Sequence, residues 1–244
     1  MLKGFKERDL RNSIRRRFKT VLPVWLIRFL LTGKRRLDWQ VLKLRPAVTL
    51  SPIQRFRRDG YNDLLTHDLG LTTDSVVLDF GGYVGDYAWA ISNRYQCQVH
   101  IFEPVPKYAN ILHDRFVNRN EIHIHEYAVG DDGGLRTFRD SADGTGAFGD
   151  GERIHVSFRS AESLLDQMPQ KIDLIAVNIE GGEYELLPAL GRVGLLARTN
   201  QLFVQFHLVG PDPIGHREMC RRLLRETHEC RWSYDFVWES WVRR

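Results

Sequence analysis

Short apolar runs alternate with amphipathic segments from residue 75 onward. Runs of β-branched and aliphatic residues, too short for helices, predict strands at 76–78, 98–104 and 122–130, at the start of 172–190, and at 200–207. Helical spacing follows these runs at 86–95, 105–118 and 216–228, and the first turn of the second helix holds Tyr108, with Leu112 and Phe116 on the same face. Strands that alternate with helices predict an α/β fold with a doubly wound, mostly parallel sheet.

Three other segments modify this picture. The stretches 134–140 and 153–160, on either side of a glycine-rich tip, predict an inserted β-hairpin, and the aromatic stretch 231–241 predicts a terminal hairpin. Ser160 with Glu162 predicts a capped helix start for 160–168. The prolines at 46 and 52 favour an extended linker over 44–56. Residues 1–45 are therefore interpreted as an N-terminal arm and 46–244 as one domain.

The charge is concentrated in the arm. Residues 1–36 contain twelve lysines and arginines and two acids, a net charge of +10, whereas the whole chain carries +4 and the remainder therefore −6. An apolar run of eleven residues, Val21 to Leu31, lies between the basic clusters and contains Pro23 and Arg28. A membrane span needs about 20 apolar residues, so we expect this run not to cross a membrane, and no signal peptide is predicted.

Three readings of the arm remain open. Residues 14–36 suit an interfacial helix on an anionic membrane, which would place the protein in the cytoplasm, peripheral at the inner face of that membrane. The same helix could instead lie on the protein's own body, or the arm could hold RNA. The acidic remainder argues against a nucleic-acid-binding body. The three cysteines have no metal-ligand spacing and suggest a reducing compartment.

The segment 76–88, VVLDFGGYVGDYA, runs from a strand into an acid, a glycine turn and a helix. Such a turn brings backbone N–H groups close to a ligand. The next strand ends in Glu103, which could accept hydrogen bonds from a ribose diol. Asp79 precedes the glycines by two residues and would repel a pyrophosphate, which argues against a nicotinamide dinucleotide. S-adenosylmethionine carries a charged amino-acid moiety and no phosphate, and we expect it as the cofactor.

Two further strand ends carry polar groups. The fourth strand leads into Asn178 and Glu180, and the fifth into Gln205 and His207. Ligands of such sheets bind at the carboxyl ends of the strands. A histidine beside a carboxylate is a candidate general base, and its alternative is a structural residue at a strand end.

From residue 74 to 207 or beyond, the chain resembles the FkbM-type S-adenosylmethionine-dependent methyltransferases. The resemblance rests on VLDFGGYVGDYA, IFEPVPKYANIL, EYAVGDD, IDLIAVNIEGGEYELLPAL and VQFH, in this order. It implies a class I methyltransferase (Rossmann-like) fold and O-methylation of a sugar, glycan or small natural product, as in polysaccharide biosynthesis. It also carries Gly81, Gly85 and Glu103 over as cofactor residues, with Ala128 beside the adenine. To the same cofactor site we assign Asp79, Gly82, Tyr83 and Pro104.

The resemblance further carries over the E-G-x-E signature, Glu180 to Glu183. We assign His207, Glu180 and Asn178 to catalysis, with His207 as the first candidate base, and Glu183 and Gln205 to the substrate. The sequence departs from the family pattern in that Ala176 and Asn178 replace a lysine and an aspartate, and Gln205 replaces a glutamate. These changes remove carboxylates, so no metal site is expected. They leave open a catalytically weakened cofactor-binding scaffold, and the basic arm leaves open an RNA methyltransferase.

Overall fold

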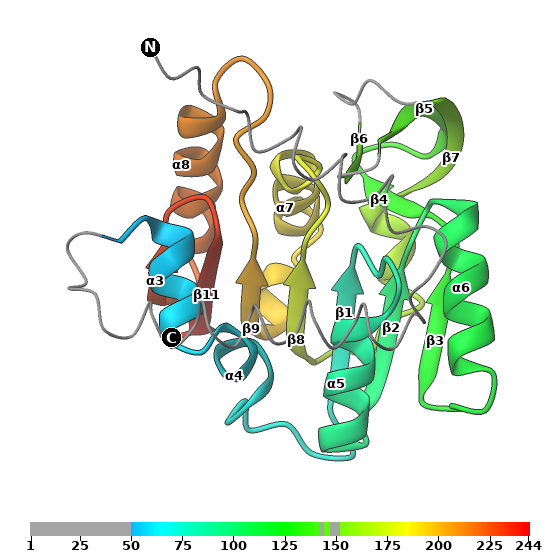
Figure 1. Ribbon diagram of the computed structural model, residues 1–244, viewed down its shortest axis with the longest axis horizontal. Helices are drawn as coiled ribbons and strands as arrows, with labels where there is room; N and C mark the ends of the chain where they lie inside the picture. Colours follow the sequence, from blue (N-terminus) through cyan, green and yellow to red (C-terminus); the bar gives the residue numbers. More distant parts are fainter. Residues whose placement is uncertain (1–49, 142–143, 147–151) are drawn as a thin grey trace, which may run out of the picture. The chain divides into compact units, whose positions relative to one another are not determined.

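The computed structural model describes residues 50–141, 144–146 and 152–244 (Figure 1). The chain divides into two compact units, 1–58 and 59–244, which are described separately. The predicted arm, including residues 14–36, lies outside the described residues. Within the part that the structure describes, no helix is long and apolar enough to cross a membrane.

In the first unit, the predicted extended linker is wrong for its last residues, because helix α3 occupies Pro52–Arg58. Gln54 Oε1 accepts a hydrogen bond from the Ser51 N–H at 3.1 Å, and Ser51 Oγ accepts one from the Gln54 N–H at 3.4 Å. This reciprocal pair is a capping box, and Pro52 occupies the first turn, where a missing N–H does no harm. The segment SPIQ thus starts a helix.

The second unit is built on a seven-stranded sheet with the order β10-β11-β9-β8-β1-β2-β3. The strands from β9 to β3 are mutually parallel, and β10 and β11 form an antiparallel hairpin that pairs with β9 through β11. The predicted doubly wound sheet and terminal hairpin are confirmed. The strand bounds are Val76–Phe80 (β1), Gln98–Phe102 (β2), Ile122–His125 (β3), Ile172–Val177 (β8), Thr199–Val204 (β9), His228–Tyr234 (β10) and Trp238–Arg243 (β11).

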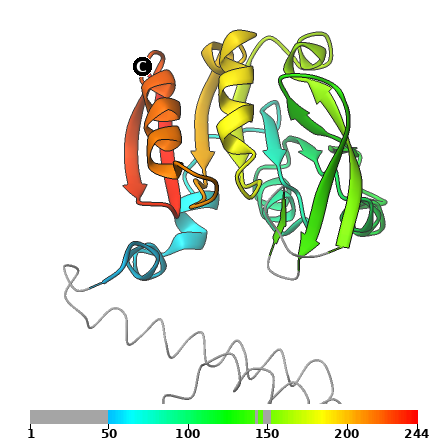
Figure 2. The ribbon, with the colours of Figure 1, turned by 90° about the horizontal axis from the view of Figure 1, so that it is seen from above.

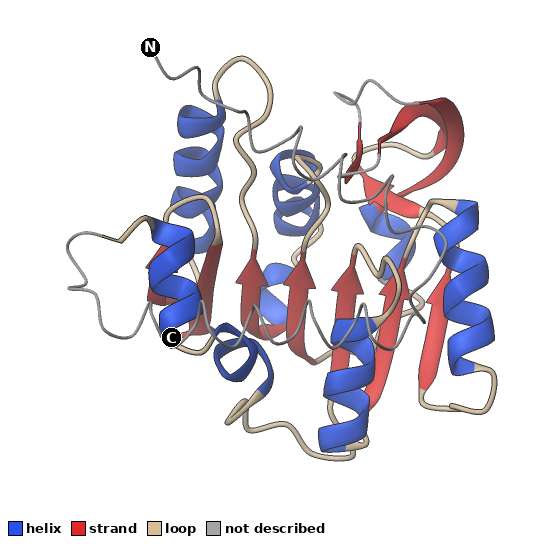
Figure 3. Ribbon diagram, viewed as in Figure 1, coloured by secondary structure: helices blue, strands red, loops and turns tan. Residues whose placement is uncertain are grey.

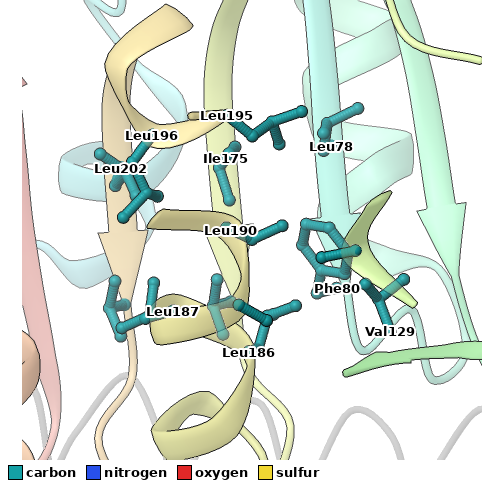
Figure 4. Close-up of a cluster of buried hydrophobic side chains, with 14 of the residues drawn as sticks. Leu78, Phe80, Val129, Ile175, Leu186, Leu187, Leu190, Leu195, Leu196 and Leu202 are labelled. Atoms are coloured by element: carbon teal, nitrogen blue, oxygen red, sulfur yellow. The ribbon is translucent and has the colours of Figure 1, made fainter. Parts of the chain in front are cut away.

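Helices flank this sheet (Figure 3), and α7 and α8 lie side by side (Figure 2). Leu186, Leu187 and Leu190 of α7 pack against alternate residues of β1, β8 and β9, in a core that excludes water almost completely (Figure 4). Burial of such aliphatic side chains supplies about 1.5–3 kcal/mol each. The helix bounds are Tyr61–Thr66 (α4), Asp86–Tyr95 (α5), Pro106–Phe116 (α6), Glu183–Arg192 (α7) and Pro213–Leu224 (α8), with a 3₁₀ turn at Leu196–Arg198 (η3).

A second, four-stranded sheet has the order β4-β7-β5-β6. Its strands β5 (Gly134–Ser141) and β7 (Glu152–Ser160) are antiparallel, which confirms the predicted inserted hairpin. The predicted strand with exit loop at 122–130 is divided, because Ala128–Gly130 forms β4 and pairs with β7. The remaining strand, β6, is Gly144–Gly146. The helix predicted after Ser160 is a 3₁₀ turn, Ala161–Leu164 (η2), and the Ser160 side chain makes no cap hydrogen bond.

Candidate active site

Four parallel strands end side by side, and these ends carry the predicted site residues. Phe80 at the end of β1 is in register with Phe102 of β2 and Val177 of β8, and Val177 is in register with Val204 of β9. The chain passes from β1 to β2 on one side, whereas β8 lies on the other side. Strand order therefore reverses between β1 and β8, and such a switch point opens a crevice for a ligand.

The glycine turn after β1 is fixed by contacts within the chain. Gly81 has a φ of +95°, and a Cβ there would lie 2.0 Å from the carbonyl oxygen of Asn178. A Cβ on Gly82 would meet Ile101, and one on Gly85 would meet the ring of Phe116. The three glycines thus allow the β1–α5 turn to approach β8 on one side and α6 on the other. This close approach leaves the turn as bare backbone at the strand ends.

Asp79 lies one residue before the end of β1 and is only 4% exposed. Its Oδ2 is buried and has no hydrogen-bond partner among the described residues. Burial, and then the nearby Glu103 carboxylate, raise the pKa of Asp79 to about 8. A buried carboxyl group with an unpartnered oxygen fits a ligand that carries an ammonium group, as S-adenosylmethionine does.

Glu103 follows β2 directly and is also buried. Its Oε2 accepts the backbone N–H of Tyr83, and its Oε1 accepts that of Val105, both at 2.9 Å. Burial raises the pKa of Glu103, and these two backbone hydrogen bonds oppose the shift. The carboxylate therefore ties the glycine turn to the β2 exit, and each oxygen retains a lone pair for a further donor.

The remaining predicted cofactor residues surround this turn. Tyr83 is 56% exposed and packs edge to face on Tyr108, with ring centroids 4.6 Å apart. Pro104 is half-buried next to Glu103, and Ala128 begins β4, directly after the Tyr127 ring that contacts Phe102. All of these positions follow the β1, β2 and β3 ends, as the sequence predicts.

His207 lies beyond the end of β9, between two carboxylates. Its Nδ1 lies 3.1 Å from Glu183 Oε1, and its Nε2 lies 3.5 Å from Glu180 Oε1. Burial lowers the pKa of His207, but Glu180 and Glu183 together outweigh burial and raise it to about 9. The proximity of His207 and Glu180 that the sequence predicts is thus present. The pKa of His207 lies above the ordinary value of a histidine, about 6.5.

Asn178 and Gln205 hold the exits of β8 and β9. The Asn178 N–H donates to the Phe80 carbonyl, and the Gln205 N–H donates to the Val177 carbonyl, both at 2.9 Å. The Asn178 side chain is exposed, whereas Gln205 is half-buried. Between them, Glu180 adopts a φ of +51°, a left-handed conformation that costs a residue with a side chain about 1–3 kcal/mol. This backbone directs the Glu180 side chain towards His207.

One further contact of this site has no signal in the sequence. The Tyr184 hydroxyl donates to the His207 carbonyl oxygen at 2.6 Å. Tyr184 follows Glu183 at the start of α7, and a tyrosine in a helical pattern predicts only packing. Only the spatial meeting of α7 with the β9 exit reveals its polar role. Among the described residues, no group of three or more histidine, cysteine, aspartate or glutamate side chains could hold a metal ion.

Solved methyltransferase structures are similar to this chain. An SAH-bound methyltransferase from Podospora anserina is 12% identical with a TM-score of 0.45, and the alignment covers 100% of this chain and 99% of that one. A putative rRNA methylase from Clostridium thermocellum is 7% identical with a TM-score of 0.47, covering 75% and 97%. Aeropyrum pernix fibrillarin bound to S-adenosyl-L-methionine is 11% identical with a TM-score of 0.46, covering 75% and 73%.

No curated protein sequence is significantly similar to this chain. The methyltransferase FkbM domain, however, matches residues 79–232, from Asp79 in β1 to Trp232 in the terminal hairpin. The match therefore covers well over half of the chain and includes every strand end described above. The predicted family, the class I methyltransferase fold and the S-adenosylmethionine cofactor are confirmed. The chain belongs to the FkbM-domain family of S-adenosylmethionine-dependent methyltransferases.

Proposed function

We propose that this methyltransferase methylates a hydroxyl oxygen of a sugar, a glycan or a small natural product, with His207 as the general base. The observation that carries the proposal is the environment of His207 Nε2, which is buried, makes no hydrogen bond to the described residues and lies beside Glu180. A hydroxyl is a weak nucleophile, and a positioned base accelerates its reaction by about 10²–10⁴-fold. In the neutral imidazole, the lone pair of Nε2 at the end of β9 suits this task.

The residues around the β1–α5 turn would hold the cofactor. Asp79 suits its ammonium group and Glu103 its ribose hydroxyls, while the backbone of the glycine turn and Ala128 would contact the remainder. When bound, S-adenosylmethionine supplies an electrophilic methyl group. Alignment of an acceptor oxygen with that group supplies several kcal/mol without any covalent step by the protein.

The protein's own part in the chemistry is to remove a proton. In its neutral form, His207 takes the acceptor hydroxyl proton at Nε2, and Glu180 stabilises the imidazolium that results. Asn178 and Gln205 are placed to hydrogen-bond the acceptor from the neighbouring strand exits. Because the pKa of His207 is about 9, the neutral form is scarce at pH 7, and activity should rise with pH up to that value.

The first test is methyl transfer from labelled S-adenosylmethionine to a panel of sugar nucleotides, lipid-linked glycans and RNA. We expect transfer to a carbohydrate hydroxyl, and a decrease in turnover of about 10²–10⁴-fold in His207→Ala with cofactor affinity unchanged by calorimetry. Cofactor binding without transfer to any acceptor would favour a scaffold, and transfer to RNA would replace the glycan proposal. Normal turnover of His207→Ala would make His207 a structural residue.

The basic arm adds a proposal about location. With a net charge of +10 in residues 1–36, the arm would attract the protein to the anionic inner face of a membrane. Such attraction is screened by salt. Loss of liposome sedimentation upon deletion of residues 14–36, or in high salt, would support this placement.

A further inference from the structure

Glu183 is the most deeply buried acid of the site. It is the first residue of α7 and is 0% exposed. Its Oε2 accepts the Gly181 N–H at 2.9 Å, and its Oε1 accepts the His207 N–H at 2.8 Å and faces His207 Nδ1 at 3.1 Å. Both oxygens are thus engaged within the protein. Because both oxygens already have partners within the protein, their geometry favours an orienting role over the substrate contact predicted for Glu183.

These contacts determine which nitrogen of His207 is available. A carboxylate only accepts hydrogen bonds, and Glu183 Oε1 lies 3.1 Å from Nδ1, whereas Glu180 Oε1 lies 3.5 Å from Nε2. The shorter contact favours the proton on Nδ1 when the imidazole is neutral. The lone pair is then on Nε2, which is buried and makes no hydrogen bond to the described residues.

The backbone of His207 is held by the same helix. The chain leaves the sheet at Val204, so the residues beyond it no longer have strand neighbours on both sides. Glu183 accepts the His207 N–H, and the Tyr184 hydroxyl donates to the His207 carbonyl. The Tyr184 ring lies between Phe206 and His216, with centroids 5.9 Å and 5.6 Å away. Two consecutive residues of α7 therefore fix both backbone polar groups of His207.

We propose that Glu183 is a positioning residue that sets the tautomer and orientation of His207, and that Tyr184 fixes the His207 backbone beside it. Glu183 then acts through His207 and touches neither the acceptor nor the cofactor. The inference rests on the proposed role of His207 as the base, and it assigns distinct roles to the two acids of the signature. Glu180 faces the reactive nitrogen, whereas Glu183 faces the opposite one.

The test compares Glu183→Gln with Glu185→Gln in the full-length protein. Glutamine keeps the shape of residue 183 and removes its charge. Glu185 lies in the same first turn of α7 but bonds the Asp131 N–H and Arg136, so it is a matched control away from His207. Histidine ¹⁵N NMR reports the tautomer and the pKa of His207 and needs no acceptor. We expect the Nδ1–H tautomer in the wild type and a pKa lower by about 1 or more in Glu183→Gln only.

Kinetics with the acceptor supply the second measurement. We expect Glu183→Gln to lower kcat by roughly 10–100-fold on the high-pH plateau, where His207 is neutral in both proteins, as loss of an orienting partner does. The acceptor KM should stay close to that of the wild type. Tyr184→Phe should lower kcat less and leave the pKa of His207 unchanged, because its hydroxyl touches only the backbone carbonyl. Thermal unfolding and cofactor calorimetry on each variant identify a folding defect.

Two results would overturn the inference. An Nε2–H tautomer in the wild type would remove the orienting role, and so would a raised acceptor KM with normal kcat in Glu183→Gln, which is the signature of a substrate contact. A failure of the proposed function looks different. In that case NMR would still show the Nδ1–H tautomer and the pKa shift, whereas His207→Ala would turn over normally.

Discussion

At the scale of single residues, the site is governed by carboxyl groups that differ in environment. Glu180 is partly exposed and faces His207 Nε2, whereas Glu183 is fully buried and faces Nδ1. Asp79 is also buried, and its Oδ2 forms no hydrogen bond with the described residues. A carboxylate beside an imidazole stabilises its charged form, whereas a carboxyl group with no cationic partner becomes neutral on burial. Burial therefore favours the neutral form of Asp79, whereas the two glutamates favour the charged form of His207.

Glu180→Gln separates two roles of this residue. If Glu180 only stabilises the charged imidazole, its loss lowers the pKa of His207 by about 1, so the pH–activity profile moves to lower pH and activity at pH 7 increases. The measurement is kcat/KM for the acceptor between pH 6 and 10, with Glu229→Gln on β10 as an exposed control. A fall in the rate at every pH would instead identify Glu180 as the base.

At the scale of elements, the crevice depends on how closely the β1–α5 turn approaches β8. The Gly81 position is restricted in two ways, by its positive φ and by the Asn178 carbonyl oxygen, which would lie 2.0 Å from an added Cβ. The sequence predicted this turn and its glycines from their order alone. It predicted them as contacts for a cofactor, whereas the structure shows that their missing side chains also make room for neighbouring strands and helices.

Gly81→Ala should therefore cost more stability than a positive φ alone explains. We expect a loss of about 2–4 kcal/mol in the free energy of unfolding, from backbone strain and overpacking together. Gly194→Ala is the matched control, because Gly194 has a φ of +75° and no described atom within 4 Å of an added Cβ. Urea unfolding measures both variants. Equal losses of unfolding free energy in the two variants would show that the β1–α5 turn moves away from β8 at little cost.

At the scale of the whole molecule, the described structure contains histidines that respond to pH in opposite directions. His100 of β2 and His125 of β3 lie with Nδ1 and Nε2 3.0 Å apart. Burial is the main cause that lowers the pKa of each to about 4. His123 and His125 add to the shift of His100, and His123 and Arg159 add to that of His125. His207 is raised to about 9. His100 and His125 stabilise the folded state in their neutral form, whereas His207 stabilises it in its charged form.

The directions of these pKa shifts predict how the stability of the folded protein changes with pH. A lowered pKa contributes stability that is present above the unfolded value of about 6.5 and is lost as pH falls towards 4. We expect His125→Phe, which keeps a ring against Phe102, to reduce the decline of unfolding free energy over this range. Val117→Phe, which adds a ring at an exposed position and removes no ionisable group, should leave the decline unchanged. Denaturant titrations from pH 4 to 7 make the comparison, and identical slopes in all three proteins would contradict it.

Local sequence patterns determined the secondary structure and the edge at which the site forms. Alternating strands and helices place the residues after β1, β2, β8 and β9 at one end of a parallel sheet, because parallel strands share their direction. Asp79, Glu103, Glu180 and His207 could thus be assigned to one crevice from their order along the chain. The SPIQ capping box was also present in the sequence, but the prolines around it favoured an extended linker. The division of residues 122–130 between two sheets had no local signal in the sequence.

Tertiary structure alone decided what these residues do to one another. Glu183 and His207 are 24 positions apart, and their hydrogen bonds exist because the start of α7 meets the exit of β9. The pKa values of Asp79 and His207 depend on burial and on charges a few ångströms away, which are properties of distance in space. A sequence orders residues along a chain and specifies their chemistry, whereas hydrogen bonding, desolvation and Coulomb interaction depend on neighbours that only the folded packing of helices and strands brings together.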